Sequence, residues 1–284
     1  MGEAHPGVGS VAWRLHREVV LLLGWGRAIL LQLAHPLVAR GVADHSPFRS
    51  ERWGRLRRLY RTLDAMLCLS FGTAEEVARV ARGINAIHDR VHGRLGEGAG
   101  VFAAGTPYSA HDPALLRWVH ATLVESHLLA YQLYVAPLTH DEQDRYCAET
   151  TGVEPLLGIP EGALPRSVAE LRRYLDGMLG SGEIAVTPLA RELAREIVSP
   201  PVPWPARPLL PVMRLPTIGL LPPSIRDGYG FPWGARHERA LRLSAGLIRT
   251  LLPVVPPGLR HWPRARAVGR QARGRDRGQA PARA

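Results

Sequence analysis

Apolar residues recur with a helical period over most of the first 198 residues of this 284-residue chain. The stretch Leu21–Arg40 is apolar on most faces, which is typical of a central core helix. Further helices are predicted over residues 50–68, 74–95, 114–136 and 237–251, because apolar positions repeat there every three or four residues. No stretch shows the alternation that marks a half-buried strand. The pattern therefore predicts an all-α fold made of a single multi-helix domain.

Several helix starts carry their own sequence signals. A threonine or serine followed three residues later by glutamate predicts a capping box, and a polar residue before proline predicts an N-cap with proline at the first helical position. The capping boxes are Thr73 with Glu76, Thr139 with Glu142 and Ser167 with Glu170, and the proline starts are Asp112-Pro113 and Thr187-Pro188.

Proline is dense from residue 199 to 233, in PPVPWPARPLLP and LLPPSIRDGYGFPWG. Such a segment favours an extended conformation that wraps a domain. We therefore predict one domain over residues 1–263, large enough to be a catalytic domain, and this domain includes the wrapping segment. Residues 264–284 form an arginine-rich basic tail, which we expect to be disordered beyond about Arg270.

The net charge of +11 does not by itself indicate a nucleic-acid partner. The sequence contains no lysine, so all 36 basic residues are arginine, and eight of them lie between Arg260 and Arg283. The remaining chain has no basic stripe interleaved with aromatic residues. We expect no nucleic-acid partner for the body of the protein.

The sequence also bears on the compartment. Cys68 and Cys147 lie far apart, which favours a reducing environment over a disulfide scaffold. The first residues lack the order of a signal peptide. The apolar run Val19–Ala39 is interrupted by Arg27, Gln32, His35 and Pro36, so a buried helix is favoured over a transmembrane anchor. We expect a cytoplasmic protein.

His88 and His92 stand one helical turn apart in INAIHDRVHG. At about 100° per residue, His88 falls inside the apolar stripe of its helix and His92 at the edge. Three interpretations stay open: a core histidine bonded to a carbonyl, an axial haem ligand, or a zinc pair. The zinc interpretation lacks the glutamate of HExxH, because Asp89 follows His88.

Other candidates are weaker on pattern alone. Arg58, Arg61 and Thr62 lie off the main apolar face of their helix, so they are surface residues unless a second face is buried. His120 lies in a helix rich in aromatic residues and histidine, which suits either core packing or a pocket wall. Neither a GxSxG nucleophile motif nor a phosphate-binding loop is present.

Five blocks together resemble a known family, the latex-clearing proteins (rubber oxygenases) and the MpaB-type oxygenases. The blocks are LLLGWGRAILLQLAHPLVARGVADHSPF, WGRLRRLYRTLDAMLCLSFG, INAIHDRVHG, YSAHDPALLRWVHATLVESHLLAY and, more loosely, LPPSIRDGYGFPW. The resemblance extends over about Leu21–Pro263, and the order and spacing of the blocks make it more specific than any single histidine pair.

The resemblance implies an all-α, partly globin-like core that binds haem b, with His88 as the proximal iron ligand. It places Arg58 and Thr62 beside the haem as an Arg-x-x-x-Thr motif. Arg61 stands where one branch of the family has a distal lysine, and an arginine is a poor iron ligand. The implied reaction uses O2 and an apolar small molecule, with an electron donor that the sequence does not name.

Two further assignments complete this expectation. We expect Arg27 to pair with a haem propionate, because a buried helix rarely carries an unpaired arginine. We expect His35, at the break before Pro36, to order the core around the pocket, and His45 to support the turn that follows. The alternatives are a haem-binding sensor without turnover and, less favoured, a zinc hydrolase that uses His88 and His92.

Overall fold

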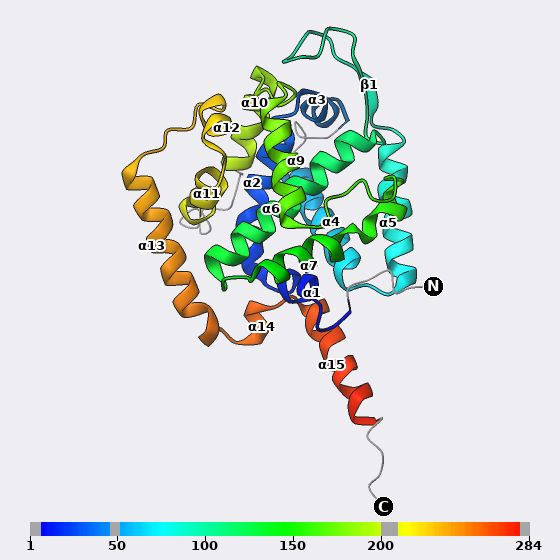
Figure 1. Ribbon diagram of the computed structural model, residues 1–284, viewed down its shortest axis with the longest axis vertical. Coiled ribbons are helices and arrows are strands. Elements are labelled where there is room, and N and C mark those ends of the chain that lie inside the picture. Colours follow the sequence, from blue (N-terminus) through cyan, green and yellow to red (C-terminus); the bar gives the residue numbers. More distant parts are fainter. Residues whose placement is uncertain (1–6, 46–51, 200–209, 279–284) are drawn as a thin grey trace, which may run out of the picture.

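A computed structural model of the chain describes residues 7–45, 52–199 and 210–278, with side chains described outside 52–59 and 273–278. Helix α2 (Leu22–Leu33) lies at the centre, and α3 (Pro36–His45), α6 (Pro113–Tyr134), α10 (Pro188–Val198) and α11 (Leu210–Gly219) pack around it (Figure 1). The expectation of an all-α domain built on a core helix is confirmed.

Most of the remaining helices lie around this centre, whereas α15 (Pro263–Gly278) extends away from the body (Figure 1). Besides α15, these helices are α1 (Val11–His16), α4 (Arg52–Phe71), α5 (Ala74–His88), α7 (His140–Thr150), α8 (Glu154–Leu157), α9 (Val168–Gly180), α12 (Pro223–Gly228), α13 (Ala235–Leu251) and α14 (Pro257–Arg260), with short 3-10 turns η1 (Val19–Leu21), η3 (Thr151–Val153) and η5 (Leu252–Val254).

The helix predicted over 21–40 is broken into α2 and α3, whose axes differ by 103°. Pro36 has no N–H to continue the ladder and disfavours a helical conformation at the residue before it. His35 instead becomes the N-cap of α3, because its Nδ1 accepts a hydrogen bond from the Leu37 N–H at 3.3 Å. The carbonyl of Ala34, freed by the break, accepts from Ala185 N at 2.9 Å.

The helix predicted over 74–95 ends early, at His88. The chain then forms the strand β1 (His92–Arg94), which pairs in antiparallel fashion with β2 (Pro107–Ser109). Gly93 allows this pairing, since a Cβ there would lie 2.6 Å from the hydroxyl of Tyr108. The expectation that no strand exists was wrong here, because a three-residue strand is too short to show an alternating pattern.

The predicted helix starts agree with the structure. Both halves of the capping box are present at α5 and at α7, and Asp112 caps α6. At α9 only the serine half forms, because the Glu170 carboxylate accepts from the Arg166 N–H instead. Thr187 caps α10 ahead of Pro188.

The proline-dense segment and the tail differ from expectation. Residues 210–219 and 223–228 are helical (α11 and α12), and Pro216 lies inside α11. Residues 200–209 lie outside the described part. The tail continues as α15 to Gly278, where disorder was expected beyond about Arg270. Its start is held to the body because Trp262 N donates to the Arg17 carbonyl and Arg264 pairs with Asp64.

Among the described helices, none taken singly has the length and hydropathy to cross a membrane. The bent pair Val19–Leu33 and Pro36–His45 meets that criterion jointly, on length and composition alone.

Candidate functional site

His88 is the last residue of α5 and continues the row formed by Val77, Ala81 and Ile84 on that helix. It is half-buried, and its ring meets the ring of His111 edge-on at 5.6 Å. Its Nδ1 is buried and has no hydrogen-bond partner among the described residues. Burial and the neighbouring His111 lower the pKa of His88, against a smaller opposite effect of Asp89. The ring is therefore neutral at pH 7, with a lone pair available for a metal.

Helices α4 and α5 form an antiparallel hairpin. This hairpin brings the positions of Arg58, Arg61 and Thr62 on α4 close to the level of His88 on α5. Gly72 and Thr73 alone connect the two helices, and the helices pack on each other (Figure 1). An equal length of α4 counted back from Phe71 reaches about position 57. Arg58, Arg61 and Thr62 thus lie within about one and a half helical turns of the level of His88 along the hairpin.

The side chains of Arg61 and Thr62 are exposed, and that of Arg58 lies outside the described part. The expectation from periodicity that Arg61 and Thr62 lie off the apolar face is confirmed. The same end of the hairpin also exposes large apolar groups, since Tyr60 is 68% and Ile87 55% exposed. Two large apolar side chains are thus exposed on the helices that carry His88 and the Arg-x-x-x-Thr residues.

The zinc interpretation required His92 to share a helix face with His88, and it does not. It lies exposed in β1, after the chain has left the helix. No group of three or more potential metal-binding side chains from His, Cys, Asp and Glu occurs among the described residues. The i, i+4 geometry of a zinc pair is therefore not formed by these two histidines.

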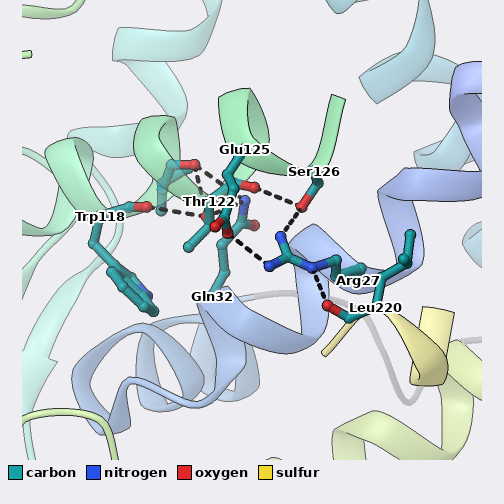
Figure 2. A network of polar contacts seen from close by, with 8 residues as sticks. Arg27, Gln32, Trp118, Thr122, Glu125, Ser126 and Leu220 are labelled. Carbon is teal, nitrogen blue, oxygen red and sulfur yellow. Dashed lines mark hydrogen bonds and ion pairs between the residues drawn. The ribbon is translucent and has the colours of Figure 1, made fainter. Parts of the chain in front are cut away.

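Arg27 is 2% exposed and has partners within the protein (Figure 2). Its Nη2 donates to the Glu125 carboxylate at 2.6 Å, its Nη1 to Ser126 Oγ at 2.8 Å, and its Nε to the Leu220 carbonyl at 2.6 Å. The expectation that a buried arginine needs an acid is correct, but Glu125 supplies that acid in place of a haem propionate. Arg27 joins α2, α6 and the residue after α11.

His35 is 2% exposed, and its ring lies 5.3 Å from that of Phe102. Burial lowers its pKa to about 4. Its Nε2 lies 3.8 Å from a Glu183 carboxylate oxygen. It orders the turn between two core helices. His45 is the last residue of α3 and contacts the carbonyl of His92 and the hydroxyl of Tyr108, while the turn it was expected to support begins outside the described residues.

His120 is held by the protein as well. Its Nε2 lies 3.1 Å from the Thr150 carbonyl, and burial lowers its pKa to about 4. Its Nδ1 is buried without a partner among the described residues. Neither His35 nor His120 contacts His88 or His111, so the structure does not gather the predicted histidines into one cluster.

A polar chain that the sequence did not indicate crosses the core beside α4. Trp25 Nε1 donates to His127 Nε2 at 3.1 Å, and His127 Nδ1 lies 3.0 Å from the Tyr146 hydroxyl. That hydroxyl lies 2.9 Å from His16 Nε2, and His16 Nδ1 lies 3.0 Å from Ser70 Oγ. Because an indole N–H can only donate, neutral His127 carries its proton on Nδ1.

This chain borders a cavity of about 30 Å³, room for a single water-sized molecule. A second, more open cavity of about 830 Å³ lies between α6, α9 and the loop before α9, lined by Arg117, Tyr174 and Glu183 among others. Neither of these two cavities is lined by His88. The five residues of the polar chain come from five different helices, and no local motif joins them: His16 in α1, Trp25 in α2, Ser70 in α4, His127 in α6 and Tyr146 in α7.

The fold and the site together define an all-α domain with a neutral, half-buried histidine at the open end of a helical hairpin. The chain belongs to the family described as ER-bound oxygenase mpaB/B'/Rubber oxygenase, catalytic domain, whose model matches residues 13–250. The suspected family is thereby confirmed, and with it an oxygenase domain. Neither the comparison with curated proteins nor the comparison with solved structures finds a match.

Proposed function

We propose that this protein is a haem b-dependent oxygenase that acts with O2 on an apolar small molecule, and that His88 is the axial ligand of the haem iron. The observation that carries the proposal is the state of His88. Its ring is neutral, its buried Nδ1 has no partner among the described residues, and exposed apolar side chains lie at the same end of the hairpin.

The chemistry of these donors fits haem. A neutral imidazole is the usual protein ligand of haem iron. The large apolar macrocycle of haem packs against apolar side chains of the protein. Tyr60 and Ile87 offer exposed apolar surface of this kind. When bound, haem supplies the activation of dioxygen, and the protein supplies binding and orientation.

The residues of α4 have an electrostatic role in this proposal. Arg61 and Thr62 expose a guanidinium group and a hydroxyl on α4, and Arg58 lies one turn before Thr62 on the same helix. Arginine stays protonated and offers several fixed donors, so these residues would hold a carboxylate of a bound cofactor or stabilise negative charge beside it. His111 packs against the His88 ring and is itself held by Asp89 at 2.8 Å, which fixes the orientation of the pair.

The experiment is expression with a haem supply, followed by an absorption spectrum, iron determination and measurement of oxygen uptake. The wild type is expected to show a Soret band, and His88→Ala to lose it or shift it strongly. His92→Ala is the matched control, because His92 is exposed and lies four residues further along the chain. A colourless wild-type protein that takes up no haem on reconstitution contradicts the proposal.

Two alternatives give different results in the same measurements. A haem-binding sensor gives the Soret band without oxygen uptake that depends on a substrate. A zinc hydrolase gives zinc in place of iron, and the separation of His88 from His92 on the fold speaks against that pair as its ligands.

A further inference from the structure

Helix α13 lies at the edge of the molecule (Figure 1). It carries a row of exposed leucines. It packs on α11 and α6 through its other face, where Leu241 and Ala245 are buried. Leu243, Leu247 and Leu251 follow one another at intervals of four residues, so they form one stripe. Their exposed fractions are 67%, 62% and 50%.

The apolar row continues beyond the helix. Val254 in η5 is 77% exposed and Leu259 in α14 is 75% exposed. Large apolar side chains that are exposed singly are ordinary, but five on consecutive segments of the chain, three of them in one helical stripe, are a feature of binding surfaces. We call this row, Leu243, Leu247, Leu251, Val254 and Leu259, the leucine edge.

Arginines dominate the sequence around the leucine edge, although two of them, Arg260 and Arg264, pair with Glu18 and Asp64. Between Glu238 and Asp276 the chain contains nine arginines and no acidic residue. Arg239 and Arg242 are exposed on α13, at roughly 40° to 100° around the helix from Leu243. The arginine-rich α15 extends away from the body just after the leucine edge (Figure 1).

We propose that the leucine edge and its arginines form a docking surface for an anionic lipid membrane, on which the protein lies peripherally. A helix with leucines on one face and arginines beside them binds in the interface, with its apolar side chains among the acyl chains and its cations at acidic headgroups. The complementary charge distinguishes this partner, because a protein partner would need acidic groups around an apolar groove and a nucleic acid would not use the leucines. This proposal is independent of the cofactor.

The test is flotation of the purified full chain with vesicles of pure phosphatidylcholine and with vesicles of an equal mixture of phosphatidylcholine and phosphatidylglycerol. The wild type is expected to float with the anionic vesicles at low salt, and less at high salt, where charges are screened. The variant Leu243→Gln/Leu247→Gln/Leu251→Gln is expected to lower partitioning about a hundredfold, and Arg239→Gln/Arg242→Gln about tenfold or more at low salt.

The controls separate docking from folding and from simple charge attraction. Val8→Gln and Val101→Gln remove exposed apolar side chains elsewhere and are expected to leave partitioning unchanged. Because the substituted leucines are exposed, the thermal unfolding temperature of the triple variant should stay close to that of the wild type. Three results overturn the proposal: no binding of the wild type to anionic vesicles, binding that the leucine substitutions leave unchanged, or a dimer in solution that the triple variant dissociates without any vesicle binding by the wild type.

Discussion

The Arg27–Glu125 pair predicts an asymmetry between its two partners. Arg27 is 2% exposed, whereas the Glu125 side chain is 27% exposed, and their charged atoms lie 2.6 Å apart. Removing one partner of a buried pair costs about 3–5 kcal/mol when the charge left behind is buried. Glu125→Ala leaves a buried guanidinium that only Ser126 Oγ and the Leu220 carbonyl contact.

The reverse substitution leaves a different residue behind. Arg27→Met leaves Glu125 able to reach water, and it leaves the Leu220 carbonyl without this donor, at a cost of about 1–3 kcal/mol. We therefore expect Glu125→Ala to destabilise the protein by roughly 2 kcal/mol more than Arg27→Met does. In a chain of this size that difference corresponds to a Tm lower by about 4–8 °C.

The assay is chemical and thermal unfolding followed by circular dichroism, for both single variants and for the double variant Arg27→Met/Glu125→Ala. The double variant should be more stable than Glu125→Ala alone, because it no longer buries an unpaired charge. The reasoning is refuted if Arg27→Met is the more destabilising substitution, or if the two effects simply add.

Two more predictions concern the packing and the titration of the core. Gly26→Ala should destabilise the protein by about 2–4 kcal/mol, because the new Cβ would lie 2.2 Å from Thr217 Oγ1 and force α2 and α11 apart. Gly83→Ala is the control: no atom lies within 4 Å of its new Cβ, so it should stabilise α5 slightly in the same unfolding assay. The free energy of unfolding should fall as the pH is lowered from 6.5 towards 4. His35 and His120 have pKa values of about 4 in the folded protein, so they bind protons in the unfolded state first. Each histidine lowers the free energy of unfolding by about 3 kcal/mol at most. Unfolding titrations that show constant stability across this range would contradict it.

The helix pattern was readable from the sequence because the helices are long and carry caps. Thr73, Thr139 and Thr187 each mark a helix start that the structure contains. The end of α5 was not readable in the same way. Val91 continues the apolar period past His88, while the pairing of β1 with β2, made possible by Gly93, decides where the helix stops.

The site was predictable in part. The apolar stripe correctly places His88 in line with buried residues of α5, and exposure confirms that Arg61 and Thr62 lie off the main apolar face. The partner of Arg27 depends on Glu125, almost a hundred residues later, and such tertiary pairing leaves no trace in local periodicity. The chain that links His16 with Tyr146 is hidden for the same reason.

The central claim is tested most directly by the absorption spectrum and iron content of the purified protein beside those of His88→Ala and His92→Ala. We expect about one haem per chain with a Soret band in the wild type and in His92→Ala, and loss or a strong shift of that band in His88→Ala. An unchanged Soret band in His88→Ala, or a wild type that binds no haem, would contradict it.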